Sequence, residues 1–213
     1  MFFKIYKNKH IKYFMAQEIL EKLFESPVKA RLLKLFLRNL NDGFTIEEAT
    51  KKTRSDSSGV EKQIKNMTAI GLLQSQKSVR KKKGKGSGVY YVANQDFEFF
   101  NELRSLVLKS SPASHEKLQD KLKKLGRVKL AVLSGVFVNQ DNGRVDLLLI
   151  GDGITDNKMH SFLKEVEAEV GKEVRYAFMD TNEFHYRFSM FDRFILDILE
   201  RPHEKIINKL GIE

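Results

Sequence analysis

The residues best suited to binding chemistry form a run of cations in the first half of the chain. Residues 77–85 contain six lysines and arginines and no acid. Such a run is most often a solvated loop, but here segments with strand character, 72–76 and 89–92, flank it and predict a long hairpin. Cations held together on a hairpin favour a polyanionic partner. The six are Lys77, Arg80, Lys81, Lys82, Lys83 and Lys85.

Residue types that support catalysis or metal binding do not form a recognisable set. The chain has no cysteine, which excludes disulfides, thiolate zinc sites and cysteine nucleophiles. Its five histidines lack zinc-ligand spacing. The glycines at 84, 86 and 88 lead into a tyrosine-containing strand, whereas phosphate-binding glycine loops lead into a helix, so they predict a hairpin tip. We therefore predict no catalytic residue, no metal and no cofactor.

Length and charge divide the chain into two parts. A length of 213 residues suits two small domains. Residues 1–110 hold 22 basic and 11 acidic side chains, while the remainder hold 16 and 17, so the positive excess belongs to the first half. Small residues and a proline at 109–114 indicate the boundary. We predict a basic arm at 1–17, a first domain at 18–110 and a second domain at 115–213.

The first domain has the apolar spacing of several short helices. Helices are predicted over 19–24, 28–39, 46–53, 57–71 and 97–108. Thr45 and Glu48 have the spacing of a capping box for the helix 46–53. Ser57 or Ser58 is suited to cap the helix 57–71. In that helix Val60, Ile64 and Met67 share one face, which leaves the other face free for a partner.

Helix, short helix, turn, helix and basic hairpin is the order of a winged helix-turn-helix. Residues 18–110 resemble arsenic-repressor-like and MarR-like transcriptional regulators in this architecture. The resemblance implies double-stranded DNA as a partner, with the third helix in the major groove and the hairpin on the backbone. We also predict a homodimer, because a single winged helix reads only a few base pairs and helices 16–24 and 97–109 carry surplus apolar residues. Carried over, the six hairpin cations bind phosphates, and Ser57, Ser58, Glu61, Lys62, Lys65 and Asn66 approach base edges.

The second domain alternates helices and strands. Helices are predicted over 115–125, 157–170 and 183–199, and strands over 127–133, 144–150 and 173–179. This alternation predicts a small α/β domain with a mixed sheet. The whole chain is therefore expected to be α+β.

The second domain has a glycine, Gly135, in the turn after its first predicted strand and an aspartate, Asp146, in its second. Residues 133–150 resemble the start of the minimal nucleotidyltransferase fold, in which two aspartates on the second strand hold magnesium and a later strand adds a carboxylate. Gly135 matches the family's glycine, but Val136 replaces its serine. Arg144 stands at the first aspartate, which leaves Asp146 alone, and the later strand offers Arg175.

These replacements bear on catalysis because magnesium in phosphoryl-transfer sites needs clustered carboxylates. A guanidinium among the ligands repels the metal, so a catalytically inactive domain is expected, with Asp146 bonded to a turn. Arg144 and Arg175 are candidates for binding an anionic ligand instead. A metal site would survive only if Asp141, Asp152 or Asp180 converged on Asp146.

Taken together, these patterns predict a cytoplasmic, homodimeric DNA-binding transcriptional regulator. Its second domain would serve sensing, assembly or partner contact, and its effector is not identified by the sequence. Two alternatives stay open: an active nucleotidyltransferase that holds a nucleic-acid substrate with its basic half, and a nucleic-acid-associated scaffold without a regulatory ligand. A membrane protein is not expected, because no apolar run reaches the roughly 18–20 residues of a span.

Overall fold

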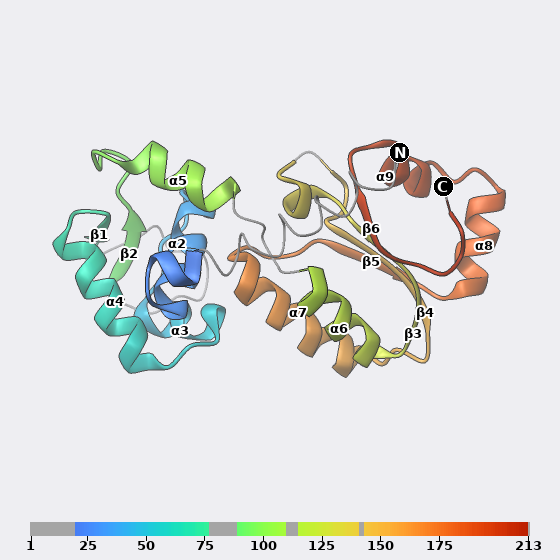
Figure 1. The fold of residues 1–213 in the computed structure, drawn as a ribbon, viewed down its shortest axis with the longest axis horizontal. Helices are drawn as coiled ribbons and strands as arrows, with labels where there is room; N and C mark the ends of the chain where they lie inside the picture. Colours follow the sequence, from blue (N-terminus) through green and yellow to red (C-terminus); the bar gives the residue numbers. More distant parts are fainter. Residues whose placement is uncertain (1–19, 77–88, 110–114, 141–142, 213) are drawn as a thin grey trace, which may run out of the picture. The chain divides into compact units, whose positions relative to one another are not determined.

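The computed structural model describes residues 20–76, 89–109, 115–140 and 143–212. The chain is mixed α+β and divides into two compact units (Figure 1). Within the described residues, the N-terminal unit holds 20–109 together with 167–172, and the C-terminal unit holds 115–166 and 173–212. Over these same ranges, no helix is long and apolar enough to cross a membrane.

The centre of the N-terminal unit is the helix α2, Pro27–Arg38. Ser26 caps it by accepting a hydrogen bond from Lys29 N at 3.2 Å, and Pro27 stands in the first turn, where its missing N–H costs nothing. Leu32 to Leu37 are all buried, so the helix is nearly surrounded. This confirms the apolar central helix that the sequence predicts.

Two further helices pack on α2. The helix α3, Ile46–Thr53, begins with the predicted capping box, in which Glu48 N donates to Thr45 Oγ1 at 3.1 Å and Thr45 N donates to Glu48 Oε2 at 3.0 Å. The helix α4, Ser57–Ala69, is capped by Asp56. The prediction that Ser57 or Ser58 caps this helix was therefore wrong. The Asp56 carboxylate accepts from Gly59 N at 2.6 Å and satisfies that otherwise unpaired N–H, so the serines lie inside the helix.

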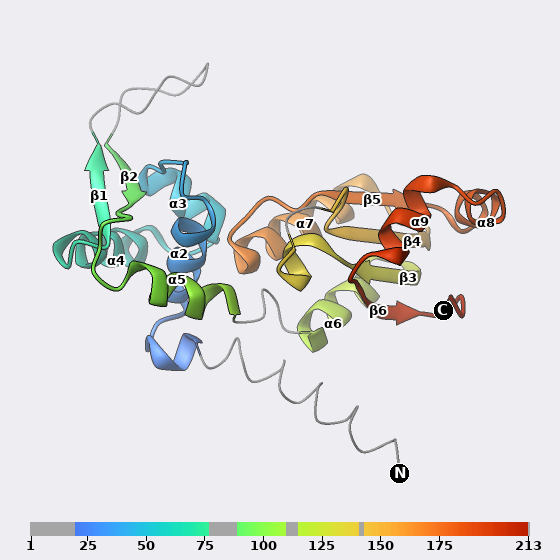
Figure 2. The same cartoon turned by 90° about the horizontal axis from the view of Figure 1, so that it is seen from above.

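A two-stranded sheet follows α4 directly. Strands β1, Leu73–Gln76, and β2, Tyr90–Ala93, pair antiparallel, with Gln76 opposite Tyr90 (Figure 2). The chain then turns and forms α5, Phe100–Lys109. We predicted this helix to begin at Phe97, but residues 94–97 form a turn in which the Asn94 side chain accepts from Asp96 N. One core of α2, α3, α4, β1, β2 and α5 side chains holds the unit together.

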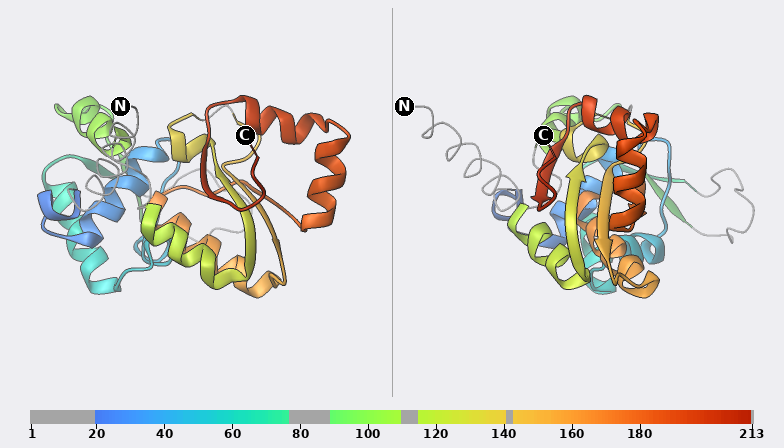
Figure 3. Two further views of the ribbon diagram at one scale, coloured as in Figure 1. Left: turned by 45° about the vertical axis from the view of Figure 1, so that its right-hand side comes forward. Right: turned by 90° about the vertical axis from the view of Figure 1, so that its right-hand side faces the viewer.

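The C-terminal unit is built on a four-stranded mixed sheet with the strand order β5-β4-β3-β6. β3, Arg127–Leu133, runs antiparallel to β4, Leu147–Asp152, and to β6, Glu204–Asn208, whereas β5, Tyr176–Met179, runs parallel to β4. α6, His115–Leu125, and α7, Asp156–Val170, lie on one face. The helices α8, Thr181–Ser189, and α9, Arg193–Glu200, lie on the other face (Figure 3). Their Phe184, Ile195 and Ile198 share a core with residues of β3 and β4.

The sequence placed four features of this unit differently. The second strand begins at Leu147 and the third at Tyr176, because the residues before them form the junction described below. The single helix predicted over 183–199 is two helices, α8, Thr181–Ser189, and α9, Arg193–Glu200, which are separated by Phe191 with a positive φ of 53°. The strand β6 was not predicted.

Candidate nucleic-acid interface

The helix α4 separates buried apolar residues from exposed polar ones. Val60, Ile64 and Met67 are buried in the core of the N-terminal unit, as predicted. Five of the six residues expected to approach DNA lie on the exposed side, and Glu61 is half-buried: the five are Ser57, Ser58, Lys62, Lys65 and Asn66. The structure therefore exposes five of the six predicted base-contact residues on one helix.

Hydrogen bonds and ion pairs already engage part of this face. Lys65 Nζ lies 2.7 Å from Glu61 Oε1, one turn away, and the hydrogen bond to that carboxylate raises the pKa of Lys65. Ser58 Oγ donates to Asp56 Oδ2 at 3.0 Å. The hydrogen bond from Gly59 N, followed by that from Ser58, lowers the pKa of Asp56 and keeps it ionised. Lys62 has no ion-pair partner within the described part of the chain and, with Asn66, is the better placed to meet a ligand.

The hairpin cations lie outside the described residues. Lys77, Arg80, Lys81, Lys82, Lys83 and Lys85 all belong to the segment 77–88, so their predicted phosphate contacts stay predictions. The positions that anchor this segment are defined: β1 and β2 pair up to Gln76 and Tyr90, which brings both ends of the segment to one end of the hairpin. Gly71, with a φ of 82°, makes the turn that joins α4 to β1.

In the C-terminal unit, Asp146 is the buried carboxylate of a junction between three strands. Its side chain is 3% exposed and accepts four hydrogen bonds. Oδ1 accepts from Val136 N, just after β3, and from Arg175 Nη2, each at 2.9 Å. Oδ2 accepts from Arg175 N at 2.9 Å and Arg175 Nε at 3.0 Å. The carboxylate thus binds a turn, as the sequence suggested, and in addition a guanidinium just before β5.

This geometry determines the charge of Asp146. Burial by itself raises the pKa of the carboxyl group, but the hydrogen bonds from Arg175 and Val136 outweigh burial and lower it overall. Gly135 is required at the junction because its φ is 52° and a Cβ there would overlap Asp146 Oδ1. The four donors occupy the lone-pair positions through which a carboxylate binds a metal.

The other carboxylates that could have completed a metal site do not converge on Asp146. Asp152 stands at the far end of β4, about 20 Å along the strand. It accepts from Thr181 Oγ1 at 2.9 Å, and Asp180 caps α8. Asp141 lies outside the described residues. Within the described ranges, no three His, Asp or Glu side chains are grouped as metal ligands would be.

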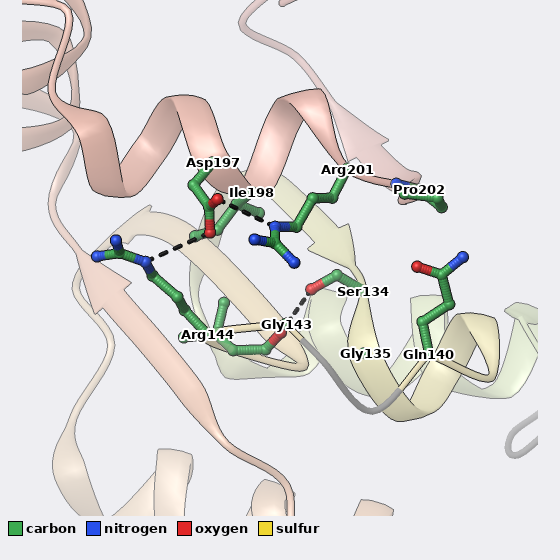
Figure 4. Close-up of a pocket in the computed structure, with 10 residues that line it drawn as sticks. Ser134, Gly135, Gln140, Gly143, Arg144, Asp197, Ile198, Arg201 and Pro202 are labelled. Carbon is green, nitrogen blue, oxygen red and sulfur yellow. Dashed lines mark hydrogen bonds and ion pairs between the residues drawn. The ribbon is translucent and has the colours of Figure 1, made fainter.

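The two candidate anion-binding arginines have separate partners. Arg175 bonds Asp146 and donates from Nη1 to Gly143 O at 2.7 Å, whereas Arg144 Nε lies 3.3 Å from Asp197 Oδ2 on α9. Asp197 also binds Arg201 Nε at 3.0 Å, and Figure 4 shows the two guanidinium groups on either side of it. They border a shallow hollow lined by Ser134, Gly135, Gln140, Gly143, Arg144, Val145, Asp197, Ile198, Arg201 and Pro202.

Comparison with protein-family models, characterised proteins and solved structures finds no match to this chain. Function is therefore inferred from the residues themselves. Sequence reasoning overlooked Asp56 and the Asp197–Arg201 pair. The first directly precedes a predicted helix, and the second has the i, i+4 spacing of a helical ion pair, so residue type and spacing could have identified both.

Proposed function

We propose that this protein is a cytoplasmic transcriptional regulator whose N-terminal unit binds duplex DNA as a winged helix-turn-helix. In this proposal α4 enters the major groove and the segment 77–88 reaches the DNA backbone. The observation that carries it is the exposed polar face of α4, which Val60, Ile64 and Met67 fix to the core. The six cations of residues 77–88 add the charge that attracts phosphate.

Within α4, Lys62 and Asn66 are the proposed base-reading pair. They are four residues apart, so they lie one above the other on the exposed face. An asparagine forms paired hydrogen bonds with adenine, and a lysine donates to guanine. Glu61 acts against binding, because it holds Lys65 and carries the same sign of charge as DNA.

The test is DNA selection followed by binding measurements over a range of salt concentrations. With about five phosphate contacts, the logarithm of affinity should fall against the logarithm of salt with a slope of about −4.5. Asn66→Ala should change the preferred sequence and leave the slope unchanged, whereas alanines at Arg80, Lys81, Lys82 and Lys83 should flatten the slope for all sequences. Glu61→Gln should strengthen binding. Salt-insensitive binding by the wild type would overturn the proposal.

We further propose that the regulator is a homodimer. A single module reads only a few base pairs, and a two-fold dimer doubles the contacts. Large apolar side chains are exposed on the flanking segments of the N-terminal unit: Leu23 is 58% exposed, Phe99 in the turn before α5 58%, and Leu106 on α5 42%. Their exposure supports burial against a second copy.

For the C-terminal unit we propose a nucleotidyltransferase-like domain that does not transfer nucleotides and serves sensing, assembly or partner contact. The support is Asp146, whose lone pairs are occupied by Val136 and Arg175. The test is incubation with magnesium and labelled nucleoside triphosphates in the presence of protein and RNA acceptors. Label transfer that Asp146→Asn abolishes would overturn this and favour the alternative, an active nucleotidyltransferase.

A further inference from the structure

The C-terminal unit is nearly neutral as a whole, but its charge is concentrated. Between positions 117 and 129 there are six cations and one carboxylate. This stretch forms most of α6, the turn at Gly126 and the start of β3. The neutrality of the second half therefore conceals a local basic surface.

Four cations define this surface, which we call the α6–β6 patch: Lys124, Arg127, Lys129 and Lys209. Lys124 lies in the last turn of α6, three residues before Arg127. Lys209 directly follows β6, and its N donates to Lys129 O at 2.7 Å, which places the fourth cation beside β3. Lys124, Arg127 and Lys209 are exposed, and Lys129 is half-buried. The four lie together at one end of the sheet.

One carboxylate of the unit faces the patch: Asp152 stands opposite Arg127 in the β3–β4 register, so the charge of the patch is reduced but not cancelled. None of its four side chains has an ion pair within the described part of the chain, in contrast to Lys121 and Lys123 nearby, which pair with Glu165 and Asp120. Arg127 and Lys129 help to lower the pKa of Asp152, but the larger causes are the hydrogen bonds from Thr181. At the same end of the sheet, Asp156 and Asp180 belong to the β4 and β5 side, whereas Asp152 on β4 adjoins Arg127 on β3.

Interaction with the dipole of α6 explains only one of the four cations. Cations in the last turn of a helix interact favourably with its dipole, which accounts for Lys124 at the end of α6. Arg127, Lys129 and Lys209 lie beyond the helix and gain nothing from it. Their common feature is positive charge, which is exposed in Arg127 and Lys209 and half-buried in Lys129.

We propose that the α6–β6 patch is a second contact with the DNA backbone, which extends the binding of the N-terminal unit without reading sequence. This inference rests on the proposed DNA binding. Duplex DNA is favoured over an acidic protein because the exposed large apolar side chains of the described residues all lie elsewhere, and protein interfaces depend on such anchors. A surface of cations alone matches a phosphate backbone.

The test uses the full chain, a duplex several helical turns long and two charge-matched variants. The patch variant is Lys124→Gln with Arg127→Gln, and the control is Lys158→Gln with Lys164→Gln on the exposed face of α7. Each lost phosphate contact reduces the salt slope by about 0.9, so between 50 and 200 mM salt the wild type should lose about 12-fold more affinity than the patch variant. The control should match the wild type, and sequence preference should stay the same in both variants.

A third variant protects the test against damage to α6. Lys209→Gln removes one cation from β6 without touching the helix and should reduce the slope by about half as much. Wild-type slopes in both the patch variant and Lys209→Gln would overturn this inference and leave the proposed function standing. If the wild type bound no duplex DNA, both would fail.

Discussion

Replacement of Asp146 by asparagine tests whether the three-strand junction depends on a charge. The substitution keeps the shape of the side chain and one acceptor oxygen, which still suits Val136 N. Its amide nitrogen then faces the donors of Arg175, where Oδ2 now accepts two hydrogen bonds. The variant therefore loses the ion pair and sets donor against donor.

The magnitude follows from the burial of the two partners. Removing one partner of a buried ion pair costs about 3–5 kcal/mol. Asp146 is 3% exposed but Arg175 is 48% exposed, so the arginine left behind is partly solvated. We expect the lower limit, a loss of about 3 kcal/mol from the unfolding free energy of the C-terminal unit, or more than a hundredfold in its unfolding equilibrium.

Amide hydrogen exchange measures the stability of each unit separately. Global unfolding of a chain with two units does not separate their contributions. Exchange in β3 and β4 should accelerate about a hundredfold in Asp146→Asn, while exchange in α2 serves as the internal reference. Glu200→Gln, at the exposed end of α9, is the control for a lost carboxylate. Equal protection of β3 and β4 in the wild type and the variant would refute the ion-pair reasoning.

Three further predictions concern the same molecule. Because the pKa of Asp146 is lowered on folding, its stabilisation is present above the unfolded pKa of about 3.9 and is lost as pH falls through the lower folded pKa. Between pH 5 and 3, the protection of β3 and β4 against amide hydrogen exchange, corrected for the intrinsic exchange rate, should therefore fall more in the wild type than in Asp146→Asn. Gly135→Ala should destabilise this unit at any pH, by the same measurement, because the added Cβ overlaps Asp146. Light scattering should give a dimeric mass, and Leu106→Glu should shift it toward the monomer by charging an exposed apolar position.

Helices were predictable where capping chemistry and apolar spacing agreed. Thr45 and Glu48 gave the start of α3, and Val60, Ile64 and Met67 gave the buried face of α4. The sequence did not predict the break between α8 and α9. Phe191 adopts a positive φ that a bulky residue normally avoids, so its residue type indicates a continuous helix.

Strand ends and site geometry were harder to predict because they depend on tertiary contacts. The sequence pattern includes Asp146 and Arg175 in the two predicted strands. In the structure both residues precede their strands, and they bond to each other across 29 positions of sequence. The sequence marked Asp146 and Arg175 as unusual, the first as a lone carboxylate and the second as a candidate anion ligand. It did not indicate that each is the partner of the other.

This pairing explains how the buried Asp146 carboxylate is stabilised. A desolvated negative charge needs a compensating positive one, and in magnesium sites the ion supplies it. Here Arg175 supplies it from within the chain, and Val136 N completes the shell, so the carboxylate joins β3, β4 and β5. A metal would first have to displace the guanidinium and leave its donors without an acceptor. The junction thus holds the ends of three strands together.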